Sequence, residues 1–103
     1  SPVQVNIIPV NNELHLDYCY EIKNILEENK IRVKLDDRNE KLGYKMRESQ
    51  TKKMPITLII GDNEVNNKQI SYRKFGNPET ITMSTEKFVE KINDCIENKK
   101  YNI

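Results

Sequence analysis

The sequence predicts an α/β fold, a three-layer α/β/α domain with three helices and a mixed five-stranded sheet. Two observations carry this prediction. Strand-like runs alternate with longer runs of helical spacing in the first half of the chain, and further short strands and turns follow before a last helix. At 103 residues the chain has the length of one domain, so residues 1–103 are expected to form a single unit. The chain starts with Ser-Pro rather than Met, and we expect it to be a piece of a longer protein.

The first strand and the first helix have the clearest pattern. Residues 3–10 alternate apolar and polar side chains before turning fully apolar, which is typical of a strand. Asn11 and Asn12 then supply a helix start, and Asn29 marks the end of the helix. The apolar positions between them recur at helical spacing: Leu14, Tyr18, Cys19, Ile22, Ile25 and Leu26.

The second strand and the second helix follow directly. Residues 31–35 alternate as a short strand. The next helix is expected to begin at residue 39 or 40, where Asn39 can cap it, and to end at residue 52 or 53. The Met54-Pro55 step disfavours any continuation, because a residue before proline avoids the helical conformation.

The central strand is expected at residues 56–60. Their sequence, ITLII, is the most apolar run in the chain and is too short for a buried helix. Residues 61–63, Gly-Asp-Asn, indicate a turn, and residues 68–74 indicate a strand that pairs antiparallel with the central one.

The last strand and the last helix complete the fold. Residues 76–78 indicate a second turn, and residues 80–83 an edge strand. Ser84 is a good N-cap for a final helix, with Glu86 placed to suit the helix dipole. One face of that helix carries Phe88, Val89, Ile92, Cys95 and Ile96.

The order of these elements predicts where a ligand would bind. Strands that alternate with helices are parallel with right-handed crossovers, which place helices on both faces of the sheet. Ligands of such sheets gather beyond the carboxyl ends of the strands. The segment after residues 31–35 lies at that end.

Composition excludes several classes of function. The chain has 17 basic and 16 acidic residues and a net charge of +1, so a polyanionic partner would need a local basic patch. Without a signal peptide or a membrane-length apolar run, we expect a soluble, cytoplasmic protein. No glycine-rich phosphate loop is present. Cys19 and Cys95 are expected to be reduced and buried, and the single histidine, His15, cannot build a metal cluster with them.

The charged run at residues 35–49, LDDRNEKLGYKMRES, leaves two interpretations open. Catalysis is disfavoured, because its carboxylates have no nucleophile or histidine nearby. The run is therefore either a solvated helix face with ion pairs or a surface that recognises a charged ligand. Residues 37–39 precede the helix at the expected ligand crevice, and Lys52 and Lys53 add a basic edge, which favours recognition.

A second polar cluster lies around Arg73. Period-2 alternation places Ser71, Arg73 and Phe75 on one side of a polar edge strand, and Glu64 lies in the turn before that strand. An Arg fork and a carboxylate match the acceptors and donors of base edges. The alternative is an ordinary surface salt bridge.

Four segments resemble a known family: PVQVNIIPVNN, DDRNEKLGYKMRESQ, KMPITLIIGDNEV with the later YRKFG, and TMSTEKFVEKI. Together they are similar to the C-terminal anticodon-binding domain of threonyl-tRNA synthetases, over essentially the whole chain. The wider class IIa group shares three of these elements, here at Asp37-Arg38, Gly43 and residues 55–61. Residues 38–48 carry the threonyl form, RNEKxGxKxRE. The resemblance implies the class IIa anticodon-binding domain fold.

The resemblance also implies the site residues. By resemblance, Asn39, Lys53, Glu64 and Arg73 contact the second and third anticodon bases, G and U, and Arg73 is the best guanine reader. Lys53 departs from the family pattern, where Arg is frequent, so the charge is kept and the bidentate fork is lost. Supporting or backbone contacts are expected from Arg38, Lys41, Lys45, Arg47, Lys52 and Lys74.

The parent enzyme implied by the resemblance is a threonine-tRNA ligase. It attaches threonine to tRNA(Thr) with ATP and Mg²⁺, uses zinc to recognise threonine, and works as a homodimer whose catalytic domain adjoins this one. We expect no catalytic residue, cofactor or metal site within this chain. The alternative is a stand-alone α/β domain that binds a protein or a small ligand without RNA specificity, because a fold does not fix a function.

Overall fold

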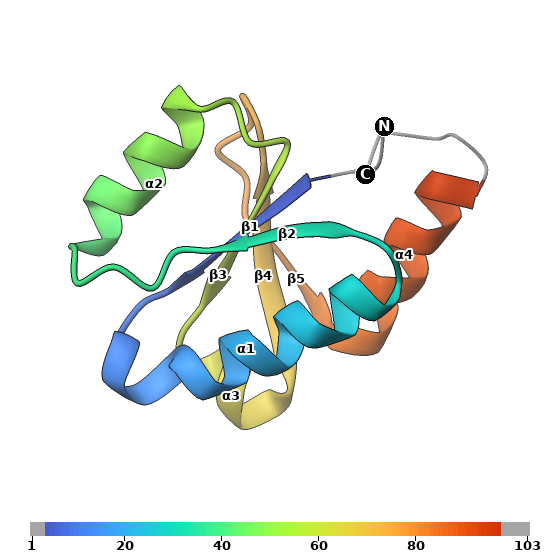
Figure 1. Ribbon diagram of the computed structural model, residues 1–103, viewed down its shortest axis with the longest axis horizontal. Coiled ribbons are helices and arrows are strands. Elements are labelled where there is room, and N and C mark those ends of the chain that lie inside the picture. The colour runs from blue at the N-terminus through green and yellow to red at the C-terminus, as the bar shows by residue number, and fades with distance from the viewer. Residues whose placement is uncertain (1–3, 98–103) are drawn as a thin grey trace.

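The computed structural model describes the backbone of residues 4–97 and the side chains of residues 4–94. Strands and helices alternate along the described chain (Figure 1). In order, they are β1 (Gln4–Pro9), α1 (Asn12–Glu28), β2 (Arg32–Leu35), α2 (Leu42–Thr51), β3 (Ile56–Ile60), α3 (Asp62–Asn67), β4 (Gln69–Lys74), β5 (Ile81–Ser84) and α4 (Thr85–Glu97).

The five strands form one mixed sheet in the order β2-β1-β3-β4-β5. β1 pairs parallel with both β2 and β3, and β4 pairs antiparallel with β3 and β5. The predicted five-stranded mixed sheet is therefore confirmed, with β3 at its centre. β4 lies inside the sheet rather than at its edge, because β5 covers its outer side.

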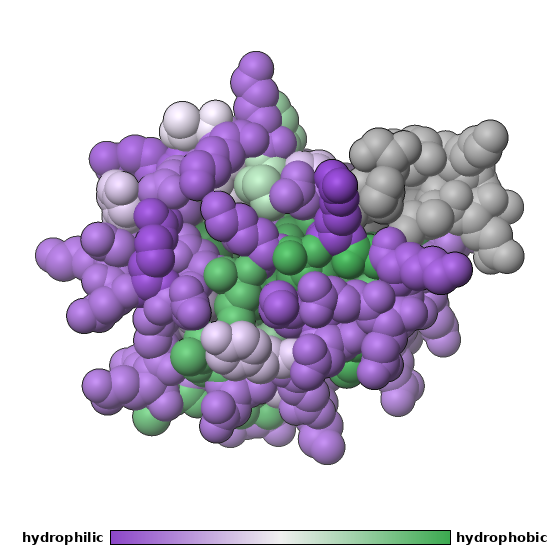
Figure 2. All heavy atoms as spheres, viewed as in Figure 1, coloured by the Kyte–Doolittle hydropathy of each residue, from purple (hydrophilic) through white to green (hydrophobic). Residues whose placement is uncertain are grey.

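Helices α1 and α4 cover one face of the sheet. Cys19, Ile22 and Leu26 of α1 and Phe88 and Ile92 of α4 are fully buried against it. The sheet contributes Val5, Ile7, Ile56, Leu58, Ile60, Ile70 and Tyr72 to this core. Their burial supplies most of the driving force for folding. In the view of Figure 2, the apolar residues gather near the middle, within a largely hydrophilic surface.

Helix α2 lies on the other face of the sheet. Ser49 of α2 bonds to Asn6 of β1 at 3.1 Å and to Thr57 of β3 at 2.7 Å, and both of these strand residues alternate with the apolar core positions. Two faces covered by helices confirm the predicted three layers.

Two expected features of the fold are wrong. Residues 61–63 begin a short fourth helix, α3, because the Glu64 carboxylate accepts the N–H of Gly61 at 2.7 Å and holds the first turn. Helix α2 begins at Leu42 with Lys41 at its N-cap, so Asn39 lies in the preceding loop and does not cap it.

Several local predictions are confirmed. The Asn11 side chain caps α1 by accepting the N–H of Glu13 at 2.8 Å, and Ser84 accepts the N–H of Lys87 at 3.2 Å at the start of α4. Cys19 is buried, and desolvation raises the pKa of its thiol to about 12. The Cys95 side chain lies outside the described residues. Within residues 4–97, no helix is long and apolar enough to cross a membrane.

Candidate nucleic-acid interface

The face of the sheet that carries α2 has many polar side chains, together with Ile8 of β1 and Ile59 of β3. Thr57 of β3 pairs with Arg73 of β4, and Ser71 of β4 pairs with Thr82 of β5, so these side chains lie on the side opposite to the core. The hydroxyl groups of Ser71 and Thr82 are 2.8 Å apart. A polar sheet face of this kind suits a polar ligand better than an apolar one.

The loop before α2 is held by Arg38. Its Nε and Nη2 donate to the two carboxylate oxygens of Asp36, each at 2.8 Å, and its Nη1 donates to Glu48 at 3.1 Å. These bonds lower the pKa of Asp36, and Lys52 and Arg38 together lower the pKa of Glu48 to about 2. Asn12 donates to the backbone oxygens of residues 37 and 38, each at 2.8 Å. Arg38 therefore shapes the loop, as expected of a supporting residue.

Lys45 is not part of an exposed basic edge. Its side chain is buried at 1% exposure, and its Nζ donates to Asn12 Oδ1 at 3.1 Å and to the backbone oxygen of Asp36 at 3.0 Å. A buried ammonium is stable only when such partners replace its water shell. Because the loop covers Lys45, the structure favours a role in holding the loop, and the RNA backbone contact stays a prediction.

Asn39 lies at the exposed part of this loop. Its side chain has no hydrogen-bond partner within the described part of the chain, in contrast to Asn12, Asp36 and Arg38 around it. Its amide is therefore available to an external ligand.

Lys52 and Lys53 follow the end of α2. Lys53 is exposed and takes the left-handed conformation (φ 56°), and its N–H bonds to the backbone oxygen of Gln50 at 3.0 Å. Lys52 bonds to Glu48 at 2.9 Å and lies beside Lys34 of β2, which lowers the pKa of Lys34. Four exposed basic residues therefore lie on α2 or at its two ends: Lys41, Arg47, Lys52 and Lys53.

Arg73 and Glu64 do not pair with each other. Arg73 is half-buried, and its Nε donates to Thr80 at 2.8 Å. Glu64 accepts from Gly61 with one oxygen and from Ser71, at 3.1 Å, with the other. The simple salt bridge considered for this pair is therefore wrong. Lys74, next to Arg73 on the strand, lies on the opposite face, because it pairs with the core residue Ile56.

The predicted base-contacting residues fall into two groups at opposite ends of the sheet. Asn39 and Glu64 lie beyond the carboxyl ends of β2 and β3, as expected. Lys53 and Arg73 lie near the amino end of β3, since Arg73 pairs with Thr57. The ten residues of α2 alone put about 15 Å between the two ends. At this separation, the two groups of residues would contact different nucleotides rather than the same one.

Two exposed aromatic side chains near this face were missed by the sequence analysis as binding residues. Tyr44 of α2 is 48% exposed, and the Arg38 guanidinium lies 5.6 Å from its ring centroid. Phe75 is 50% exposed just beyond β4. The sequence signals for Phe75 were its place beside a turn glycine and the period-2 alternation that puts it on the same side of the strand as Arg73.

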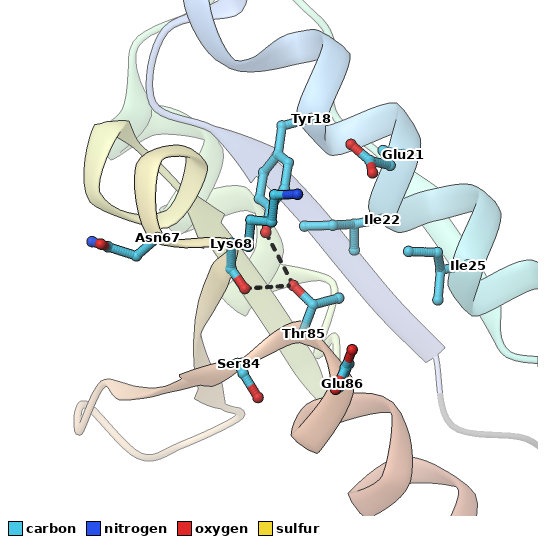
Figure 3. Close-up of a pocket in the computed structure, with 9 residues that line it drawn as sticks. All are labelled: Tyr18, Glu21, Ile22, Ile25, Asn67, Lys68, Ser84, Thr85 and Glu86. Carbon is cyan, nitrogen blue, oxygen red and sulfur yellow. Dashed lines mark hydrogen bonds between the residues drawn. The ribbon is translucent and has the colours of Figure 1, made fainter.

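A cavity of about 400 Å³ lies elsewhere, between α1, the end of α3 and the start of α4 (Figure 3). The Tyr18 hydroxyl lies 3.0 Å from Thr85 Oγ1 and donates to the backbone oxygen of Gln69 at 3.0 Å. Glu21 and Glu86 also line it. Two carboxylates disfavour a polyanion, and the four predicted base-contacting residues are not among its lining.

His15 links α1 to α3. Its Nδ1 accepts the N–H of Asn11 at 3.0 Å, and its Nε2 lies 2.6 Å from Asp62. Both ring nitrogens are thus engaged. Among the described residues, no group of three or more His, Cys, Asp or Glu side chains is arranged to hold a metal ion.

The family model described as "Anticodon binding domain" matches residues 4–94. The threonine-tRNA ligase of Oceanobacillus iheyensis is 44% identical over 100 residues, which are 97% of this chain and 16% of that protein. That of Ligilactobacillus salivarius is 48% identical over 98 residues, 95% of this chain and 15% of that protein. The chain therefore spans only about a sixth of the length of these curated relatives.

A solved structure shares the fold. The RNA binding domain of threonyl-tRNA synthetase from Cryptosporidium parvum Iowa II superposes with a TM-score of 0.84, at 21% identity, over 91% of this chain and 24% of that one. At that identity the likeness supports the fold alone.

Proposed function

Because the chain belongs to the anticodon binding domain family, we propose that it recognises the anticodon loop of threonine tRNAs as part of a threonine-tRNA ligase. The observation that carries this proposal is the exposure of Asn39 and Lys53, on the loops before and after α2, and of part of Arg73 on β4. Proteins that bind RNA by sequence address unstacked bases in loops, and such bases expose hydrogen-bonding edges that these side chains match.

Arg73 is suited to the guanine at the second anticodon position. The bond from its Nε to Thr80 orients the guanidinium and leaves the two terminal nitrogens without a partner among the described residues. Two parallel N–H donors match O6 and N7 of guanine. Lys53, close to the same end of β3, supplies a single charged contact.

Glu64 and Asn39 are suited to the uracil. Each carboxylate oxygen of Glu64 accepts one internal hydrogen bond and has a lone pair left, so the side chain is held in place and can still accept a base N–H. The amide of Asn39 can both donate and accept. The local cations at Lys41, Arg47 and Lys52 supply backbone contacts that a net charge of +1 alone would not.

The chemistry of the parent enzyme is assigned to the part of it outside this chain. In this proposal, a catalytic domain uses ATP and Mg²⁺ to attach threonine to the tRNA and holds the zinc that recognises threonine. The enzyme acts in the cytoplasm as a homodimer, and this chain contributes tRNA selection.

The test is a titration of the 103-residue chain with two RNA stem-loops. One carries a threonine anticodon and the other differs only in its central G. We expect tighter binding of the first by about 1–3 kcal/mol. Equal affinity for both RNAs would contradict specific recognition, and a domain that binds a protein or a small ligand would give that result.

A further inference from the structure

Phe75 is an exposed aromatic side chain held in a fixed turn. Half of it is exposed, so it adds little to the core. The turn around it is fixed by a hydrogen bond from Asn77 N–H to the backbone oxygen of Lys74 at 3.1 Å, and by Gly76, whose φ of +77° is one that glycine adopts readily. A ring on such a turn loses little conformational entropy when a ligand binds.

Phe75 lies on the same side of the sheet as Arg73. Ile56 pairs with Lys74, and the bond from Phe75 N–H to the backbone oxygen of Pro55 at 3.0 Å continues that pairing by one residue. Side chains two residues apart on a strand face the same side of the sheet, so Phe75 faces the same side as Arg73.

The same bond brings Phe75 close to the segment that contains Lys53. Pro55 is two residues beyond Lys53, and Figure 1 shows the connection between α2 and β3 beside the turn that follows β4. An aromatic ring, an Arg with free terminal donors and a Lys ammonium thus lie at one end of β3. Tyr44 is a weaker candidate, because the Arg38 guanidinium lies against its ring.

We propose that Phe75 is a stacking platform for an unpaired base of the RNA, next to the base that Arg73 contacts. This inference rests on the proposed anticodon recognition and adds to it a contact of a different kind. Unstacked bases in loops regain their lost stacking on exposed aromatic rings, and such contacts tolerate any base because every base has a π-face. Cations beside the ring favour a nucleic acid over an apolar protein surface.

The chain contains no tryptophan, so a Phe75→Trp variant carries one indole, at the position in question. We expect this variant to bind the threonine anticodon stem-loop as tightly as the parent chain, and its fluorescence to be quenched in the complex. Phe75→Ala and Phe75→Leu should both weaken binding about 5- to 100-fold, because neither side chain can stack. The matched control is Leu14→Ala on α1, which is 67% exposed and should leave the affinity unchanged.

Two outcomes would overturn the proposal, and they differ. If Phe75→Ala and Phe75→Leu bind normally and the indole is not quenched, while Arg73→Ala still lowers affinity, Phe75 does not stack and anticodon recognition stands; Phe75 then faces a protein. If the parent chain binds neither stem-loop, both proposals fall. Circular dichroism melting of each variant separates lost binding from lost folding.

Discussion

Arg38 and Asp36 form a two-point ion pair in which Nε and Nη2 of the guanidinium each lie 2.8 Å from a carboxylate oxygen. The second side of the same guanidinium bonds to Glu48 of α2. One side chain therefore joins the end of β2 to the middle of α2, and the loop that presents Asn39 lies between them. Planar pairs of this kind fix orientation as well as distance.

This ion pair predicts a dependence of stability on pH. The folded-state pKa values of Asp36 and Glu48 lie below their ordinary values, so their contribution is present above about pH 4–5 and is lost as the pH falls toward 2. Arg38→Ala should destabilise the chain at pH 7 and reduce the loss of unfolding free energy between pH 5 and pH 2.5, as measured by urea unfolding from pH 7 to pH 2.5. Arg32→Ala, an exposed arginine on β2, is the control. If Arg38→Ala loses stability toward low pH as steeply as the parent chain, the ion pair contributes nothing to stability.

Lys45 is predicted to matter for folding rather than for RNA contact. Lys45→Ala removes a buried ammonium and leaves Asn12 Oδ1 and the Asp36 backbone oxygen without this donor, so we expect a loss of about 2–4 kcal/mol. Lys41→Ala, at an exposed position four residues earlier, should change stability by less than about 0.5 kcal/mol. Urea unfolding measures both. A stable Lys45→Ala chain that fails only to bind RNA would contradict this role.

Replacement of Gly43 and Gly76 by alanine should change the stability of the chain in opposite directions. Nothing lies within 4 Å of a Cβ added at Gly43 or Gly76, so backbone conformation alone decides. Gly43 is in α2, where alanine should stabilise by about 0.5–1 kcal/mol. Gly76 has φ +77°, where alanine should cost about 1 kcal/mol. Thermal melting of both variants tests this, and a shift of the same sign in both would refute it.

Lys52 is predicted to contact the RNA backbone without regard to sequence. Lys52→Ala should weaken binding of both stem-loops alike and reduce the slope of log affinity against log salt by about one. Lys23→Ala is a matched control, because Lys23 pairs with Glu27 on α1 as Lys52 pairs with Glu48 on α2. A change in base preference on mutating Lys52 would instead indicate a base contact.

Much of the fold could be predicted from the sequence because its strands and two long helices have regular apolar periods. Helix α3 was missed because DNEVNN has no such period, and the helix is held at its start by Glu64 bonding back to Gly61. The start of α2 was misplaced because Asn39 resembles a cap, whereas Asn12, distant in sequence, holds the backbone before it. The family resemblance, confirmed by the relatives, rested on four sequence segments and did not depend on where each helix begins or ends.

The candidate site was less predictable, because it depends on burial. Lys45 lies in a run of charged residues and has nothing local that sets it apart from Lys41, yet tertiary packing buries it beneath the loop. Ser71 of β4 helps to fix Glu64, and Thr80 orients Arg73. Both contacts depend on how the folded chain brings these residues together. Only the folded structure shows which charged side chains are exposed to a ligand.

The most direct test of base recognition by Arg73 is a double-mutant cycle that changes this residue and the central anticodon base. The affinities of the parent chain and of Arg73→Ala are measured for stem-loops with G or A at that position. The parent chain should prefer G by about 1–3 kcal/mol, and Arg73→Ala should bind the two RNAs equally. An Arg73→Ala chain that keeps the full preference for G would contradict the assignment of base recognition to this face of the sheet.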